Sequence, residues 1–209
     1  GNSLNHEIHF KNEKNHWWFQ SRREILRNIL YIIGESNQQS LSLLEVGCGT
    51  GGNLRLLFNN FQTLTGIDID EDALKFAKME SSNITYIQGD ANYDLSDYPD
   101  KSFSTVILSH TIQAMIFPEK VIENLIRIGK RAIISFPNFG FWKVRRDFLF
   151  SGLMPKNKIL PFEWYNTPNI HLCSLSDFKE FCKKKKIKVE QLVTLNESGI
   201  NTDYKFFLN

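Results

Sequence analysis

The stretch that decides the fold is "LLEVGCGTGGNL", residues 43–54, in which a short apolar run passes directly into a cluster of glycines. Glycine adopts positive φ angles and lets the backbone approach a ligand closely. The stretch therefore predicts a strand that ends in a tight turn at the start of a helix. Such a turn typically holds a nucleotide-like ligand on the free N–H groups of the helix N-terminus.

The rest of the chain predicts an alternation of strands and helices. The β-rich runs are "SLLEV", "TLTGID", "ITYIQG", "STVILS", "RAIISF", "KVEQLVTL" and "YKFFLN". Segments such as "PEKVIENLIRIG" are long enough for crossover helices between the first five runs, whereas only "NESGINT" separates the last two. We therefore expect an α/β fold, a doubly wound, Rossmann-like, seven-stranded, mostly parallel sheet whose last strand is antiparallel.

Length and composition favour one domain over residues 1–209. Two segments do not fit the alternation. Residues 1–40, with the aromatic opening "NHWWFQSRREILRNIL", are expected to form an N-terminal helical cap. Residues 139–171 are expected to form a lid-like insertion, because long irregular stretches are uncommon in compact domains and usually cover a site.

Composition excludes several classes of protein. With 25 basic and 23 acidic side chains, the overall charge does not favour a nucleic-acid partner. The run Lys183 to Lys186 is a local exception, which is either a solvated helix end or a phosphate-binding patch. No apolar run approaches the roughly 18 residues of a membrane span, and the start lacks a signal-peptide core, so we expect a soluble, cytoplasmic protein without a membrane partner. The three cysteines lack CxxC spacing, which also favours a reducing compartment. No metal is expected, because His6, His9 and His16 lack partners at ligand spacing.

The glycine turn itself fits two templates. One is Gly47-x-Gly49-x-Gly51, and the other is the dinucleotide pattern Gly47-x-Gly49-x-x-Gly52. Glu45 precedes the first glycine within the expected strand, where a carboxylate is awkward for a pyrophosphate but useful near a cationic ammonium or sulfonium group. Alternatively, Glu45 only ties amides of the loop together.

Two further carboxylates favour an adenosine ligand. Asp68 ends the second expected strand, where a carboxylate can accept both ribose hydroxyls. An acidic residue in such a place is more often a helix cap, a role that Asp70 can also fill. After the third expected strand, the Asp90 carboxylate can accept the adenine amino group and the Ala91 amide can serve a ring nitrogen.

Together these motifs resemble the class I S-adenosylmethionine-dependent methyltransferases. The resemblance implies that the turn holds the methionine part of S-adenosylmethionine or S-adenosylhomocysteine, that Asp68 binds the ribose, and that Ile69 and Asp90 meet the face and edge of the adenine. The cofactor-binding residues that it implies are Glu45, Gly47, Gly49, Gly51, Asp68, Ile69, Asp90, Ala91 and Ser109. A nicotinamide-dependent oxidoreductase fits the turn but explains neither Glu45 nor the Gly-Asp-Ala element.

From the fourth strand onward the chain resembles the MetW family, named for a role in methionine biosynthesis. The similar stretches are "SHTIQAM", "IGKRAIISFPNFGFWKVR" and "GLMPKNKILPFEWYNTPNIHLCSLSDF". Two functions follow from the resemblance: a methyltransferase acting on a small molecule, or a non-catalytic subunit that binds the cofactor and assists a homoserine O-acyltransferase. An enzyme should bury Trp142, Trp164 and Tyr165 around a small cavity, whereas a subunit should expose them.

Candidates for chemistry lie after the fourth strand and in the insertion. His110 directly follows the strand, where a side chain can reach the methyl group of the cofactor, although a loop histidine satisfied by backbone groups is the alternative. Tyr165 and His171, together with Glu163, Trp164 and Asn166, can form a lid over a small acceptor. The alternative is that the aromatic side chains only pack the insertion onto the sheet.

Overall fold

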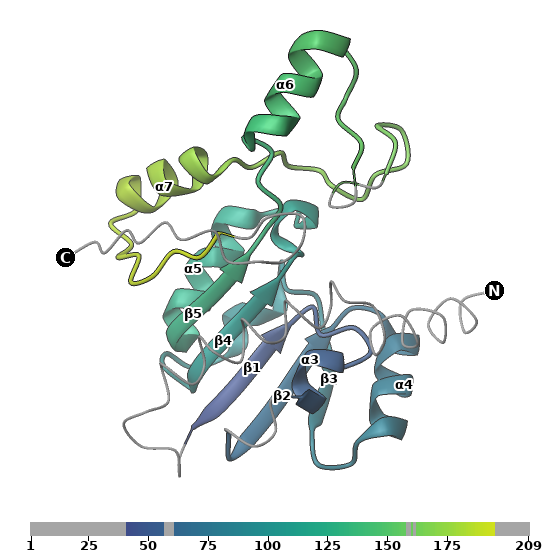
Figure 1. Cartoon of the computed structure of the whole chain (residues 1–209). Helices are drawn as coiled ribbons and strands as arrows, with labels where there is room; N and C mark the ends of the chain where they lie inside the picture. The colour runs from purple at the N-terminus through teal and green to yellow at the C-terminus, as the bar shows by residue number, and fades with distance from the viewer. Residues whose placement is uncertain (1–40, 57–60, 158–159, 161, 195–209) are drawn as a thin grey trace. The chain divides into compact units, whose positions relative to one another are not determined.

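The computed structural model describes residues 41–56, 61–157, 160 and 162–194 (Figure 1). By its internal contacts the chain divides into two compact units, with the boundary between Ser135 and Phe136. Each unit is described by itself, and the expectation of a single domain stays a prediction. The expected N-terminal helical cap lies outside the described residues.

The first unit contains a five-stranded parallel sheet. Its strands are β1 (Ser42–Val46), β2 (Thr63–Asp68), β3 (Thr85–Gln88), β4 (Phe103–Ser109) and β5 (Gly129–Ser135). They pair in the order β3-β2-β1-β4-β5, and every pair is parallel (Figure 1). Strand order reverses between β1 and β4, and ligands of such sheets bind outside the carboxyl ends of the strands at this point.

Helices connect the strands of this sheet. They are α3 (Gly52–Leu56), α4 (Glu71–Glu80) and α5 (Pro118–Ile128), with short 3-10 turns η3 (Asp94–Asp97) and η4 (Ile112–Ala114). The cap of α4 is Asp70, whose carboxylate accepts the amides of Asp72 and Ala73. Asp68 is therefore not needed as the cap, and its carboxylate is available for another role.

The core lies around the central strand. Leu43, Leu44 and Val46 of β1 are fully buried, as expected for a strand covered on both faces of a parallel sheet. On α5, Val121, Ile122, Leu125 and Ile128 are also buried, at the spacing of one face of a helix. Burial of these side chains holds the carboxyl ends of the strands in fixed positions.

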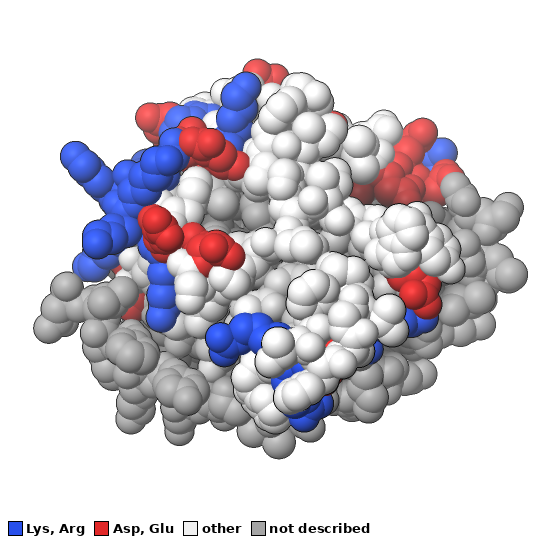
Figure 2. Space-filling view, turned by 90° about the horizontal axis from the view of Figure 1, so that it is seen from above, with Lys and Arg blue, Asp and Glu red and all other residues white. Residues whose placement is uncertain are grey.

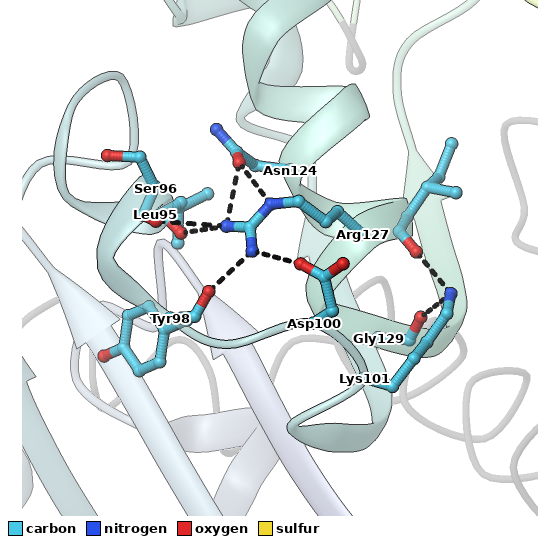
Figure 3. Close-up of polar contacts among 9 residues, drawn as sticks. Leu95, Ser96, Tyr98, Asp100, Lys101, Asn124, Arg127 and Gly129 are labelled. Atoms are coloured by element: carbon cyan, nitrogen blue, oxygen red, sulfur yellow. Dashed lines mark hydrogen bonds and ion pairs between the residues drawn. The ribbon is translucent and has the colours of Figure 1, made fainter.

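The amino ends of β4 and β5 carry a dense polar network (Figure 3). Arg127, at the end of α5, donates from Nη1 to the Tyr98 carbonyl at 2.6 Å and to Asp100 at 2.8 Å. It also donates to the carbonyls of Leu95 and Ser96 and to the Asn124 side chain. Beside it, Lys101 donates to the carbonyls of Ile126 at 2.7 Å and Gly129 at 2.8 Å. The network ties the chain before β4 to the chain before β5.

The second unit contains α6 (Trp142–Ser151) and α7 (Leu175–Lys184). Ser174 and Asp177 form a capping box at the start of α7. Asn138 joins the chain before α6 to the start of α7, because its side-chain oxygen accepts the amides of both Gly140 and Leu175. The Phe139 amide adds a bond of 3.1 Å to the Cys173 carbonyl.

The basic run that ends α7 is exposed at Lys183, Lys184 and Lys186. Figure 2 shows Lys and Arg side chains gathered at the left of the view. Cations suit the C-terminal end of a helix dipole, so this run has an ordinary structural explanation.

Two expectations about the fold need comment. The described residues contain five strands: residues 188–194, in the sixth expected strand, have no assigned strand, and the seventh expected strand, in "YKFFLN", lies outside the described residues. The count of seven strands and the antiparallel last strand are therefore not confirmed. In addition, part of the segment expected to be irregular is the helix α6. The lid role of residues 139–171 stays a prediction.

Candidate functional site

The glycine turn after β1 has the predicted geometry. Gly47, Gly49 and Gly51 have φ angles of 71°, 52° and 75°, in the left-handed region that favours glycine. The amides of Gly47 and Cys48 donate to the Ile67 carbonyl at 2.8 and 3.2 Å. The turn is thereby fixed to the neighbouring strand β2, and α3 begins directly after it.

The three glycines face different surroundings. A Cβ on Gly51 would lie 2.3 Å from the buried Tyr86 hydroxyl oxygen, and one on Gly47 would lie 3.0 Å from the Thr111 methyl carbon. Among the described residues, a Cβ on Gly49 would meet no atom within 4 Å. The turn is therefore packed on two sides and open at Gly49, where a ligand can approach the backbone.

Asp68 lies at the carboxyl end of β2 and holds the open part of this turn. Its Oδ2 accepts the Gly49 amide at 2.7 Å, and its Oδ1 accepts the Asp70 amide at 2.9 Å. Each carboxylate oxygen can accept a second bond, so both retain acceptor capacity. The neighbouring Ile69 side chain is 65% exposed. The pair offers a carboxylate and an apolar surface side by side.

Asp90 and Ala91 follow β3, whose partner in the sheet is β2. The Asp90 carboxylate accepts both the backbone and the side-chain amide of Asn92 at 2.8 Å, and the Asp90 amide donates to Asp94 at 2.6 Å. Ala91 is buried. This loop is thus held by its own side chains and shares the carboxyl edge of the sheet with the glycine turn.

Glu45 is buried within β1, with an exposed fraction of only 1%. Its Oε1 accepts the Asn53 side-chain amide at 2.6 Å, which joins the strand to the first turn of α3. Burial, helped by the negative charges of Glu45 and Asp68, raises the pKa of the nearby Cys48 thiol. These carboxylates make the base of the turn electrically negative, a setting that suits a cationic ligand group.

The segment after β4 completes the edge. The hydroxyl groups of Ser109 and Ser135 lie 3.3 Å apart, and the His110 amide donates to the Ser135 carbonyl at 2.9 Å. His110 has a φ angle of 55°, a strained value outside glycine. Thr111 Oγ1 and Gln113 Oε1 are buried and have no hydrogen-bond partner among the described residues. Buried polar atoms of this kind often belong to sites that bind a ligand or water.

The other two catalytic candidates belong to the second unit. Tyr165 is 70% exposed and packs edge-on against Trp164, with ring centroids 5.6 Å apart. His171 is also exposed, and Glu163 pairs with Lys156. The structure therefore brings together the cofactor-binding candidates and His110 on one sheet edge, whereas the roles of Tyr165 and His171 stay predictions.

Sequence reasoning missed three side chains at this edge, namely Asn92, Thr111 and Gln113. Asn92 directly follows the Gly-Asp-Ala element, and asparagine is a common turn residue that bonds nearby backbone groups. The position of Asn92 therefore indicated, from the sequence alone, that its side chain bonds to neighbouring groups of the loop. No local pattern distinguishes Thr111 or Gln113 from ordinary loop residues, because their burial depends on the folded sheet.

Residues 41–56, 61–157, 160 and 162–194 contain neither a candidate metal site nor a helix that could span a membrane. No group of three or more His, Cys, Asp or Glu side chains is arranged there to hold a metal ion. None of the helices in these ranges has the length and apolar content needed to cross a bilayer. The histidines at positions 6, 9 and 16 lie outside the described residues.

Solved structures share the fold. The plantazolicin methyltransferase BpumL, solved in complex with S-adenosylhomocysteine (SAH), is 19% identical with a TM-score of 0.62, and the match covers 90% of this chain and 72% of that one. An S-adenosylmethionine-dependent methyltransferase from Archaeoglobus fulgidus is 19% identical with a TM-score of 0.56, over 85% of this chain and 72% of that one. The fold is the α/β, Rossmann-like fold of methyltransferases.

Several relatives match in sequence, among them the following two proteins. The bifunctional methionine biosynthesis protein MetXA/MetW of Rhodopirellula baltica is 28% identical over 162 residues, 73% of this chain and 26% of the relative. A fatty-acid O-methyltransferase of Mycolicibacterium smegmatis is 35% identical over 77 residues, 35% of this chain and 27% of the relative. The chain thus matches about a quarter of the length of each.

The family comparison covers most of the chain. The model described as "Methionine biosynthesis protein MetW" matches residues 24–209. This agrees with the resemblance that the sequence shows after the fourth strand. The chain belongs to the MetW family.

Proposed function

We propose that the chain binds S-adenosylmethionine at the carboxyl edge of the β3-β2-β1-β4-β5 sheet and transfers its methyl group to a small-molecule acceptor. The observation that carries the proposal is the Asp68 carboxylate, which holds the Gly49 amide at 2.7 Å and keeps acceptor capacity on both oxygens. A helix-capping role does not account for Asp68, because Asp70 caps α4.

The residues present fit this cofactor. The open side of Gly49 admits the methionine part, Asp68 accepts the ribose hydroxyls, and Ile69 offers its exposed side chain to one face of the adenine. Asp90 and the Ala91 amide serve the edge of the base. The buried negative charge of Glu45 beneath the turn favours the cationic part of the ligand. The bound cofactor supplies a methyl group activated by its sulfonium.

Methyl transfer then needs an acceptor in line with that group and little competing water. His110 is the proposed residue for this end of the site, because it directly follows β4 and is held by a backbone bond to Ser135. Residues 139–171 are proposed to cover the acceptor, with Tyr165 and His171 as further contacts. The methyltransferase names of several relatives support the reaction class.

Calorimetry on the full chain tests the cofactor. We expect SAH and S-adenosylmethionine to bind in preference to NAD. Asp68→Ala should cost about 1 to 3 kcal/mol of SAH affinity, the usual range for hydrogen bonds to a charged acceptor. The matched control is Asp70→Ala, which removes a helix cap and should lower stability by about 1 kcal/mol without changing affinity. Equal or tighter binding of NAD would overturn the proposal.

A second candidate function is supported by the exposed aromatic side chains of the second unit. Trp142, Trp164 and Tyr165 have exposed fractions of 53%, 74% and 70%. Trp and Tyr are favoured anchors of protein interfaces. The Rhodopirellula relative carries MetXA and MetW names on one chain. A MetW-type subunit that assists a homoserine O-acyltransferase is therefore the alternative.

Co-purification separates the two candidates. A subunit should retain a homoserine O-acyltransferase, and Trp164→Ala should release it while SAH binding persists. The matched control is Met79→Ala, which truncates an exposed apolar side chain of α4 in the first unit. Methyl transfer to a small acceptor by the isolated chain would instead support the enzyme.

A further inference from the structure

Asn92 joins two loops of the candidate site. It follows β3, and its side-chain nitrogen donates to Asp90 Oδ1 at 2.8 Å. Its side-chain oxygen accepts the amides of Ile116 and Phe117, in the loop after β4, at 2.9 and 3.0 Å. The orientation of the Asn92 amide is fixed by chemistry, because a carboxylate can only accept and backbone N–H groups can only donate.

These bonds leave one carboxylate oxygen of Asp90 available. Both bonds from Asn92, one from its backbone and one from its side chain, reach Oδ1. Within the described ranges no hydrogen bond reaches Asp90 Oδ2. The Asp90 amide is itself fixed by its bond of 2.6 Å to Asp94. Asn92 thus holds one oxygen and leaves the other for a donor that comes from outside the loop.

The far side of Asn92 stabilises the start of α5. Phe117 precedes that helix and makes no side-chain capping bond, so Asn92 supplies an acceptor from a different loop. The Tyr93 ring packs edge-on against the Phe117 ring, with centroids 5.9 Å apart. The loops after β3 and β4 are therefore joined by both polar and aromatic contacts.

We propose that Asn92 is a positioning residue that aims the Asp90 carboxylate at the exocyclic amino group of the adenine and couples this recognition to the loop after β4. This inference rests on the proposed function, because it requires an adenosine ligand at Asp90. It assigns base selectivity to a side chain that need not touch the ligand. Occupancy of the adenine end should also reduce the mobility of the backbone at Ile116 and Phe117.

The test compares SAH with its deaminated analogue S-inosylhomocysteine, which lacks the amino group. Wild-type protein should prefer SAH by about tenfold, the effect of one hydrogen bond to a charged acceptor. Asn92→Asp keeps an acceptor for the amides of Ile116 and Phe117 but loses the donor to Asp90. The ratio of the affinity for SAH to the affinity for S-inosylhomocysteine should therefore fall towards one. Asn92→Ala should also lose the preference. The matched control is Asn124→Asp, beside Arg127, which should keep it.

Hydrogen exchange supplies a second readout. SAH should slow exchange of the Ile116 and Phe117 amides in the wild-type protein and in Asn124→Asp, but not in Asn92→Ala. If the wild-type protein binds SAH and the Asn92 variants keep the tenfold preference, the inference is wrong and the proposed function stands. If the folded wild-type protein does not bind SAH, both are wrong.

Discussion

The two edges of the parallel sheet differ in how their polar groups are used. At the amino edge, Arg127 and Lys101 donate to backbone carbonyls and side-chain oxygens of the neighbouring chain segments (Figure 3). At the carboxyl edge, Thr111 Oγ1 and Gln113 Oε1 are buried without a partner among the described residues, and Asp68 keeps spare acceptor capacity. Satisfied polar groups stabilise a fold, whereas unsatisfied ones cost stability unless a ligand uses them. We therefore expect the amino edge to contribute mainly to stability, and we propose ligand binding at the carboxyl edge.

The largest expected effect concerns the glycine turn. Gly51→Ala should lower the free energy of unfolding by about 3 kcal/mol or more, because the new Cβ combines a positive φ with a clash against Tyr86. Gly49→Ala is the matched control. It has the same kind of backbone strain but open space, so it should cost only about 1 kcal/mol. Denaturant unfolding measures both, and equal losses would contradict the packing described at Gly51.

The next prediction tests the amino edge. Arg127→Ala should destabilise the protein by about 2 to 3 kcal/mol, because three backbone carbonyls and Asp100 lose a charged donor. Affinity for SAH should not change. Arg127→Lys should restore little, since an ammonium cannot reproduce the forked geometry of a guanidinium. A large loss of SAH affinity at unchanged stability would contradict the expectation that the amino edge contributes to stability and not to ligand binding.

At the carboxyl edge a substitution should instead stabilise the protein. Thr111→Val keeps the side-chain shape and removes a buried hydroxyl that has no partner in the described part of the chain, so stability should rise by about 1 kcal/mol. Thermal unfolding of the ligand-free protein measures this change. A loss of stability would show that the hydroxyl is satisfied in solution.

The smallest expected effect concerns Cys48 beneath the turn. Burial raises its pKa above the ordinary value of 9.0, so the folded protein keeps a proton that the unfolded chain releases. This contribution to the free energy of unfolding is fully present well below pH 9.0, the pKa of the unfolded chain, and is lost as the pH rises from there towards the raised pKa of the folded protein. Relative to Cys48→Ala, the wild-type protein should lose about 0.4 kcal/mol more between pH 8 and 9. If the free energies of unfolding of the wild-type protein and of Cys48→Ala changed with pH in the same way, the prediction would be wrong.

The local sequence was sufficient to predict a strand or helix where the residues of that element show a clear periodicity of apolar side chains. The runs "SLLEV" and "TLTGID" match β1 and β2, and "EDALKFAKME" matches α4. The helix α6 was not predicted, because "WKVRRDFLFS" mixes aromatic and basic residues around the whole helix and shows no clear apolar stripe. Of its side chains only Val144 is buried.

The candidate site was predictable where its residues follow strands directly. Glycines 47, 49 and 51, Asp68 and Asp90 reach one edge because parallel strands end there together. The role of Asn92 was not predictable, since its partners Ile116 and Phe117 lie 24 and 25 residues away and meet it only when β3 and β4 join one sheet. Bonds that depend on strand order leave no pattern in the local sequence.

The pair of hydrogen bonds at Asn138 closes a long loop that contains α6 and the segment between α6 and α7. One side-chain oxygen accepts a backbone amide before α6 and another at the start of α7, and the second of these bonds spans 37 residues of sequence. Because the ends are fixed to one another, the cost of lengthening the loop grows slowly, by about 0.6 kcal/mol for each doubling. We therefore expect insertions between residues 152 and 172 to leave the start of α7 in place. Evolution and engineering have the same freedom there to vary the length and sequence of the segment.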